Sequence, residues 1–241
     1  MSDRPAIAAA LFDAGGTLIR LDFEWMAESV RGLGYDVTPA VLREAEVQGR
    51  LRFDASDRSS IAPYFGGTRD AAGVPPTLVP AVLDAWHERQ RTVGLWVKPM
   101  EGAREALEGA RAAGLRVAVI SNSDGRAEQH LIDCGLRDSV EFVVDSGRVG
   151  VEKPDRRIFD LALERMGLPP GRAVYVGDVR SVDRMGAEGA GLHFILVDAT
   201  GTYGREDERR VSQMSRLPEL MAGWFTLPSV DLNLNGGAAW S

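Results

Sequence analysis

The feature that most constrains the fold of this chain is an alternation of short apolar runs and helix-like segments from residue 100 to residue 197. Apolar runs that are typical of buried strands occupy 115–120, 140–144, 173–176 and 193–197. Apolar residues recur at helical spacing in 101–113, 125–134, 155–166 and 181–189. Strands that alternate with helices at this spacing pair in parallel, so the sequence predicts an α/β fold with a doubly wound parallel sheet.

The first strand of the predicted sheet lies far from the others in the sequence. An apolar run over 7–12 ends in Asp13. Helical patterns then occupy 23–32, 38–52 and 78–92, separated by turn-rich stretches at 54–60, 66–69 and 73–77. We therefore expect a smaller α-helical domain inserted after the first strand, with hinges near 19–22 and 94–99. The predicted division is a core at 1–19 and 95–226, a helical insertion at 20–94 and a C-terminal tail at 227–241.

Composition excludes several classes of protein. The 241 residues carry 28 Lys and Arg against 35 Asp and Glu, which gives a net charge of −7, and the basic residues are scattered. We expect no nucleic-acid partner, since binding to a phosphate backbone needs clustered basic residues. We expect no membrane partner either, because no window approaches the roughly 18 consecutive apolar residues of a membrane span. The single cysteine, Cys134, is expected to be a buried helix residue, and such a low cysteine content favours a cytoplasmic location.

Polar side chains follow several predicted strands at the points where these strands end. Asp13 follows the first strand, Ser121 and Asn122 follow the next, and Asp178 follows a third, with Asp183 five positions later. A single aspartate in such a place is more often a turn former. Because open parallel sheets bind ligands beyond the carboxyl ends of their strands, we expect these side chains to converge on one site.

Converging carboxylates repel one another unless a cation joins them. Mg²⁺ prefers a few carboxylates together with waters and phosphate oxygens. Lys153, one of only two lysines in the chain, lies in the loop before a predicted helix. Gly15 and Gly16, beside Asp13, leave the backbone open to close approach by a substrate. Phosphoryl transfer is indicated by this combination of groups, which comprises carboxylates, a cation, a hydroxyl, an amide and an ammonium group.

Four segments in this order resemble the motifs of the haloacid dehalogenase superfamily. They are LFDAGGTL at 11–18, VISNS at 119–123, VGVEKPDRRIF at 149–159 and VYVGDVRSVDRMGAEGAG at 174–191. The helical insertion stands where subfamily I of this superfamily has its C1-type cap. The resemblance implies a Rossmann-like core, a helical cap and hydrolysis of a small phosphorylated metabolite, and it leaves the oligomeric state open.

The resemblance also implies roles for single residues. Asp13 would be the nucleophile that forms an aspartyl phosphate, with Lys153 as its catalytic partner. The implied phosphate- and substrate-binding residues are Gly16, Ser121, Asn122 and Lys153. The implied Mg²⁺ ligands are Asp13, the carbonyl of Gly15, Asp178 and, directly or through water, Asp183.

Gly15 departs from the pattern of most phosphatases of this superfamily, which carry a second aspartate there as general acid and base. General acid–base catalysis typically contributes about 10²- to 10⁴-fold. An alkyl phosphate, with its poor leaving group, loses most from this absence, and an acyl or aryl phosphate loses least. Restoring the carboxylate with Gly15→Asp should therefore raise the turnover of alkyl phosphates.

The sequence also bears on three other functions. Phosphonate cleavage needs a cap lysine, and residues 20–95 contain none. A metal-free haloacid dehalogenase could cradle its substrate's carboxylate with Arg43, but such enzymes abandon the Gly-Asp motif that is intact at Gly177 and Asp178. A catalytically silent member that binds a metabolite or a protein through its cap is the third possibility.

The sequence leaves the roles of some other polar and aromatic side chains open. His87, on a predicted cap helix, could replace the missing acid or lie at the surface, and His130 and His193 are expected to be structural. Asp124 is expected to cap the helix that follows it. The cap aromatics either line a substrate pocket or form the cap's own core, and they are Trp25, Tyr35, Phe53, Tyr64, Phe65 and Trp86.

Overall fold

The computed structural model describes residues 4–58, 60–204 and 209–228, and within them six strands form one parallel sheet. The strand order is β5-β4-β1-β6-β7-β8, with β1 near the centre, and Phe12 of β1 pairs with Val119 and Val176. The strands are β1 (Ala9–Phe12), β4 (Arg116–Ser121), β5 (Val143–Asp145), β6 (Ala173–Gly177), β7 (His193–Val197) and β8 (Arg210–Val211). This arrangement confirms the predicted α/β fold with a parallel sheet.

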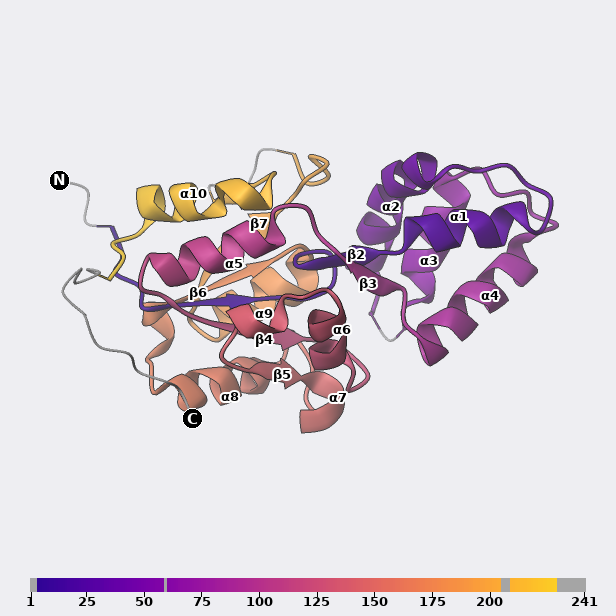
Figure 1. Cartoon of the computed structure of the whole chain (residues 1–241). Helices are drawn as coiled ribbons and strands as arrows, with labels where there is room; N and C mark the ends of the chain where they lie inside the picture. The colour runs from indigo at the N-terminus through magenta and orange to yellow at the C-terminus, as the bar shows by residue number, and fades with distance from the viewer. Residues whose placement is uncertain (1–3, 59, 205–208, 229–241) are drawn as a thin grey trace.

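Helices cover both faces of the sheet (Figure 1). One face packs against α5 (Ala103–Ala112), α6 (Ala127–Asp133) and α10 (Leu217–Trp224). The other packs against α8 (Arg156–Met166) and α9 (Met185–Gly189). Successive residues of β1 alternate between these two apolar cores, as the period of two along a strand requires.

Short helical segments complete the connections of the α/β part. They are α7 (Ser146–Val149), the 3₁₀ turns η1 (Arg137–Ser139), η2 (Pro170–Arg172) and η4 (Met214–Arg216), and the π-helical turn η3 (Arg180–Arg184). No helix in the described part of the chain is both long enough and apolar enough to span a bilayer.

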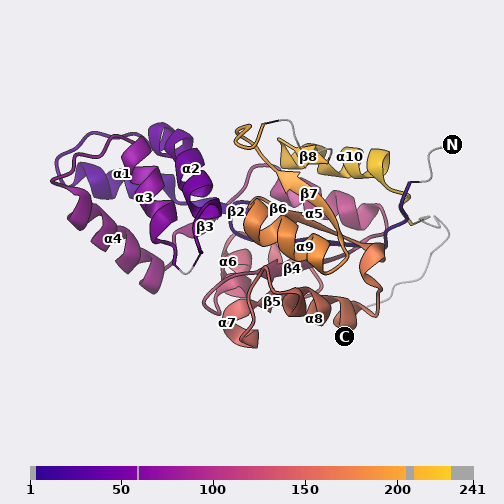
Figure 2. The same cartoon turned by 180° about the vertical axis from the view of Figure 1, so that it is seen from behind.

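Four helices within residues 23–92 form a separate lobe beside the sheet (Figures 1 and 2). They are α1 (Phe23–Arg31), α2 (Pro39–Asp54), α3 (Ala62–Ala71) and α4 (Val79–Thr92). The lobe has an apolar core of its own, which includes Met26, Phe65 and Trp86. Two chain crossings, β2 (Ile19–Leu21) and β3 (Trp96–Pro99), pair as an antiparallel ribbon and join the lobe to the sheet.

The structure corrects several expectations about elements. Residues 66–69, expected as a turn, lie inside α3, and the ribbon of β2 and β3 stands where only hinges were expected. Asp124 does not cap α6: the carboxylate of Asp145 accepts from Ala127 N at 2.9 Å, whereas Asp124 pairs with Arg126. Cys134, expected to be buried, is partly exposed just after α6. The expected tail at 227–241 lies outside the described residues from 229 onward.

Candidate active site

The carboxyl ends of the central strands face a pocket of about 290 Å³. Asp13 follows β1, Ser121 ends β4 and Asp178 follows β6, and all three are buried. Residues of the helical lobe and of β3 line the opposite side of the pocket. The predicted site residues that line it together are Asp13, Gly15, Ser121, Asn122, Lys153, Asp178 and Asp183.

Lys153 joins two carboxylates at the centre of this site. Its Nζ lies 2.6 Å from Asp13 Oδ1, 2.7 Å from Asp183 Oδ1 and 2.9 Å from the Tyr175 hydroxyl oxygen. Burial by itself lowers the pKa of Lys153, but the attraction of the two carboxylates outweighs burial and raises this pKa above its usual value. Lys153 therefore remains a cation that can offset the charge of a phosphate group.

Burial has the opposite effect on the carboxyl group of Asp13. Loss of hydration raises the pKa of Asp13 from 3.8 to about 6, although the neighbouring Lys153 ammonium opposes this rise. The side chain is held by Lys153 at the end of β1, and it faces the pocket. Near neutral pH a fixed carboxylate of this kind can act as a nucleophile toward a group in the pocket.

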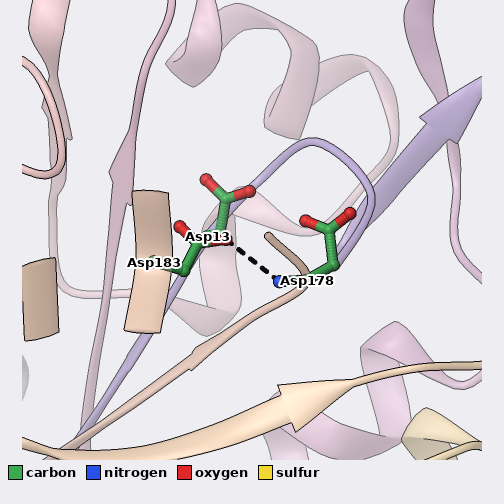
Figure 3. Close-up of side chains that lie close together, drawn as sticks. All are labelled: Asp13, Asp178 and Asp183. Carbon is green, nitrogen blue, oxygen red and sulfur yellow. Dashed lines mark hydrogen bonds between the residues drawn. The ribbon is translucent and has the colours of Figure 1, made fainter. Parts of the chain in front are cut away.

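Asp13, Asp178 and Asp183 each bring a carboxylate oxygen within 4.8 Å of the others (Figure 3). Asp178 Oδ1 is buried and accepts no hydrogen bond from the described residues. Burial raises the pKa of Asp178 well above its usual value, against the opposing charge of Arg50. A buried carboxylate oxygen without a partner is costly unless a proton or a cation compensates it. The oxygen donors present here therefore fit a hard cation such as Mg²⁺.

Both oxygens of Asp183 are already engaged. Oδ1 accepts from Lys153 Nζ, and Oδ2 accepts from the backbone N–H groups of Asp178 at 3.0 Å and Val179 at 2.9 Å. The bond to Asp178 is the dashed line in Figure 3. This geometry favours a positioning role, in which Asp183 fixes the loop that carries Asp178. Direct ligation of Mg²⁺ by Asp183 stays a prediction.

Gly15 and Gly16 contribute to the site in different ways. Gly16 has a φ of +81°, and a Cβ there would lie 2.3 Å from Asp178 Oδ2. Gly16 therefore gives room to the Asp178 carboxylate, and its predicted contact with phosphate stays untested. The Gly15 carbonyl accepts no hydrogen bond in the described part of the chain, so it remains available as a metal ligand.

Ser121 and Asn122 differ in what their side chains contact. The Ser121 hydroxyl makes no hydrogen bond to the described residues and lines the pocket. The Asn122 amide bonds the backbone of Lys153 at both ends, as donor to its carbonyl at 2.9 Å and as acceptor from its N–H at 2.8 Å. Asn122 thus orients Lys153, and its predicted contact with phosphate remains a prediction.

Sequence reasoning missed three side chains of the site. Tyr175, which resembles any buried strand residue, accepts from Lys153 and donates to the Ile120 carbonyl at 2.9 Å. Arg50 of α2 reaches across from the helical lobe and places its Nε 3.5 Å from Asp178 Oδ2. Trp96 of β3 lies directly over Gly15. No pattern in the sequence pairs Arg50 or Trp96 with residues so distant along the chain.

The structure removes two candidates from the site. Arg43 is exposed and lies over the Phe23 ring, so it does not reach the pocket as a dehalogenase interpretation required. His87 is exposed beside Phe65 and does not line the pocket. His130, expected to be structural, does line it, with Nε2 3.3 Å from the Val93 carbonyl oxygen.

The cap aromatics divide between the two expected roles. Phe65 and Trp86 are fully buried in the core of the helical lobe. Phe53 and Tyr64 also contact this core, but they line the pocket as well. Trp25 and Tyr35 pack against the lobe core and do not line the pocket. The alternatives of core and pocket are therefore both correct, for different residues.

Comparison with known proteins finds a family model and similar chains. The model of "haloacid dehalogenase-like hydrolase" matches residues 7–191. A mouse (Mus musculus) protein, "haloacid dehalogenase-like hydrolase domain-containing protein 3", is 37% identical over 168 residues, which cover 70% of this chain and 63% of the relative. The match thus spans less than two thirds of the mouse protein. A "glyceraldehyde 3-phosphate phosphatase" of Methanopyrus kandleri is 32% identical over 193 residues, covering 77% of this chain and 82% of the relative.

Solved structures share the fold. A haloacid dehalogenase-type phosphatase from Thermococcus onnurineus has a TM-score of 0.59 at 22% identity, covering 91% of this chain and 100% of that one. A 2-haloacid dehalogenase from Pseudomonas syringae has a TM-score of 0.54 at 25% identity, covering 90% and 99%. Since one fold carries both chemistries, the choice between them depends on the site.

Proposed function

The chain belongs to the haloacid dehalogenase-like hydrolase family, and from this premise we propose that it is a Mg²⁺-dependent phosphatase or phosphotransferase acting through an aspartyl phosphate on Asp13. The substrate would be a small phosphorylated metabolite, and the proposed location is the cytoplasm. The observation that carries the proposal is the orphaned Asp178 Oδ1 beside Asp13 and Lys153. A cation at this position would compensate the buried oxygen, which has no hydrogen-bond donor among the described residues.

In the proposed reaction, an Asp13 oxygen attacks phosphorus and the bond from phosphorus to the leaving oxygen breaks. Lys153, fixed by Asn122 and Asp183, offsets charge on the phosphoryl oxygens, and the Ser121 hydroxyl donates a hydrogen bond to one of them. Water then breaks the bond between Asp13 and phosphorus and releases inorganic phosphate.

Asp13, the Gly15 carbonyl and Asp178 would hold the Mg²⁺ ion. When bound, Mg²⁺ neutralises the carboxylates and the phosphate and so permits their approach. Arg50 forms an ion pair with the other oxygen of Asp178, Oδ2, so Oδ1 is left for the ion. Asp183 would act through the loop that it holds by two backbone N–H groups.

Turnover and trapping test this proposal. We expect hydrolysis of 4-nitrophenyl phosphate and acetyl phosphate that depends on Mg²⁺, and an Asp13 adduct with beryllium fluoride visible by ¹⁹F NMR. Asp13→Asn should lose both. Asp160→Asn, which changes an aspartate of α8 paired with Arg156, is the matched control and should retain both.

Two outcomes would contradict the proposal in different ways. Release of halide from 2-chloropropionate without added metal, and no phosphatase turnover, would establish dehalogenation. Calorimetric binding of phosphorylated metabolites with neither turnover nor fluoride adduct would establish a catalytically silent binding protein.

A further inference from the structure

Trp96 occupies the space into which a side chain at position 15 would point. A Cβ built on Gly15 would lie 3.2 Å from Trp96 Cδ1 and 3.5 Å from Nε1. The Cδ1–Nε1 edge of the indole therefore stands beside the nucleophile, where a second carboxylate would extend. The indole N–H makes no hydrogen bond within the described residues, and the ring lines the pocket.

Neighbouring aromatic rings hold this indole in place. Trp96 stacks on Phe65 with centroids 6.0 Å apart and planes at 25°, and it meets Tyr64 edge to face at 5.3 Å. Phe65 is fully buried and packs in turn against Trp86 at 6.0 Å. Trp96 is thus a fixed wall of the pocket, because its partners have no room to move.

Much of the pocket wall beside Trp96 is apolar. It includes Phe53, Ile61 and Tyr64 of the helical lobe and Val182 of the α/β part. The Tyr64 hydroxyl donates to Glu46 Oε1 at 2.5 Å, so it does not offer that bond to a ligand. Gln90, Ser123 and His130 also line the pocket, but Gln90 Oε1 already accepts from Leu95 N at 2.9 Å and His130 Nε2 lies 3.3 Å from the Val93 carbonyl oxygen. A leaving group in this space therefore meets mainly rings and aliphatic side chains and few unengaged hydrogen-bonding groups.

The charge and the size of the pocket further restrict which leaving groups it can bind. Among the described residues that line the pocket, Lys153 is the one Lys or Arg, and Asp13 and Asp183 already hold it. A leaving group that carries a carboxylate would thus find no unengaged Lys or Arg there. The volume of about 290 Å³ lies at the lower end of ligand pockets, about 300–1,000 Å³. A single ring with one phosphate group suits this volume better than a nucleotide does.

We propose that Trp96 is a specificity-determining residue and that the substrate class is the phosphate monoester of a small, uncharged aromatic alcohol of the phenol type. The inference rests on the proposed function and names the substrate class of the same site. Trp96, Phe53 and Tyr64 bind the flat ring of the leaving group, and the phosphate group meets Lys153 and Ser121.

The chemistry of a phenol suits a site without a second carboxylate. An Asp13 oxygen forms a bond to phosphorus, and the bond from phosphorus to the phenol oxygen breaks and leaves its electron pair on that oxygen. The phenolate takes its proton from water. A second water hydrolyses the aspartyl phosphate, and the proton that it releases neutralises the hydroxide left by the first water. One aryl phosphate and one water thus give one phenol and one inorganic phosphate. An alkoxide needs a proton donor at departure far more than a phenolate does.

Binding of non-hydrolysable analogues tests the inference without turnover. Calorimetry in the presence of Mg²⁺ compares phenylphosphonate with methylphosphonate, which differ by the ring alone. We expect the wild-type protein to bind phenylphosphonate at least about tenfold more tightly, since burial of a ring against aromatic walls supplies that much. Trp96→Leu should lose most of this preference, and Trp96→Phe should keep most of it.

Trp25→Leu is the matched control, because Trp25 packs on the helical lobe outside the pocket and its loss should leave the preference unchanged. Equal binding of the two phosphonates by the wild-type protein would overturn the inference, whether or not any variant folds. Retention of the full preference by a folded Trp96→Leu variant would overturn it as well.

Turnover separates this inference from the proposed function. We expect the wild-type protein to hydrolyse phenyl phosphate and acetyl phosphate. In Trp96→Leu, kcat/KM should fall at least about fivefold for phenyl phosphate and should not fall for acetyl phosphate. These results together would support the proposed function and the inference. Hydrolysis of acetyl phosphate without that of phenyl phosphate overturns the substrate class alone. Failure of both substrates overturns the proposed function and, with it, the inference.

Discussion

At the scale of single residues, Gly15 and Trp96 share one small volume beside Asp13. The glycine leaves room for the indole edge, which would lie 3.2 Å from a Cβ at position 15. Such a distance is short for two carbon atoms, so the indole must shift for any side chain to fit there. A substitution at position 15 therefore cannot be understood without Trp96, and the expectation that Gly15→Asp alone restores proton transfer needs revision.

A pair of substitutions tests this dependence. We expect Gly15→Asp alone to change the kcat for 2-glycerol phosphate little, because Trp96 blocks the carboxylate. Gly15→Asp together with Trp96→Val should raise this kcat by about 10²-fold, the lower end of what general acid–base catalysis supplies. Trp96→Val alone is the control and should give no gain. A full gain from Gly15→Asp alone would show that the indole does not obstruct the site.

The pKa of Asp13 makes a second prediction at this scale, for the metal-free protein in EDTA. The folded-state pKa, about 6, lies above the ordinary value of 3.8. The folded state therefore binds this proton more tightly, and the resulting stabilisation is complete below pH 3.8 and is lost as pH rises through 6. The difference corresponds to about 3 kcal/mol.

Urea unfolding between pH 4 and pH 7 measures this effect as a difference between two proteins. The free energy of unfolding of the wild-type protein should fall with pH relative to that of Asp13→Asn, which has no such proton. Saturating Mg²⁺ should flatten the difference, since a cation favours the ionised carboxylate. Parallel pH profiles of the two proteins in EDTA would contradict the prediction.

At the scale of elements, glycines show what the sequence can and cannot predict. Gly114, Gly135 and Gly167 have positive φ and follow α5, α6 and α8, a position that is typical of glycine at helix ends. Gly67 has another role: a Cβ there would lie 2.6 Å from the Gln48 carbonyl oxygen, so it lets α3 pack closely on α2. Local pattern does not separate the two roles, which explains why residues 66–69 were predicted as a turn.

Local sequence also does not identify which residue caps a helix, and a substitution of Asp145 tests this point. Its carboxylate accepts from the N–H groups of Gly125, Ala127 and Gly147, which lie at the starts of α6 and α7. We expect Asp145→Ala to lower the free energy of unfolding by about 2–3 kcal/mol, since it leaves the N–H groups of Gly125 and Ala127, of which the bond of Ala127 is buried, without an acceptor. Asp124→Ala, the cap that local sequence suggested, should cost under about 1 kcal/mol because its ion pair with Arg126 is exposed. Equal losses in urea unfolding would restore Asp124 as the cap.

At the scale of the whole molecule, α2 ties the helical lobe to the loop that carries Asp178 and Asp183. Arg50 lies 3.5 Å from Asp178 Oδ2 and 3.9 Å from Glu46, and Asp54 accepts from the backbone N–H of Ser181 at 2.7 Å. The positions of the central strands along the chain and the residues at their ends followed from local pattern. The contacts of Arg50 with Asp178 and of Asp54 with Ser181 did not, because they join residues more than a hundred positions apart whose meeting depends on how the lobe packs.

Removal of the Arg50 charge tests this connection. Arg50→Met leaves the buried carboxylates of Asp178 and Glu46 without their cation, and breaking such a pair costs about 3–5 kcal/mol. We expect urea unfolding of the metal-free variant to show a loss near the lower end of this range, because Asp178 can take up a proton instead. Burial holds the folded-state pKa of Asp178 above its usual value, so this relief is present at low pH and is lost as pH rises.

Mg²⁺ distinguishes this cause from a simple loss of packing. The ion would replace the missing positive charge beside Asp178, so Mg²⁺ should recover part of the lost free energy in Arg50→Met. Arg43→Met is the matched control, since Arg43 lies on the same helix but is exposed over Phe23, and it should change the free energy of unfolding by less than about 0.5 kcal/mol. The idea fails if the loss in the free energy of unfolding of Arg50→Met changes neither with pH nor with Mg²⁺. Arg50 would then stabilise the protein through packing alone and not through its charge beside Asp178.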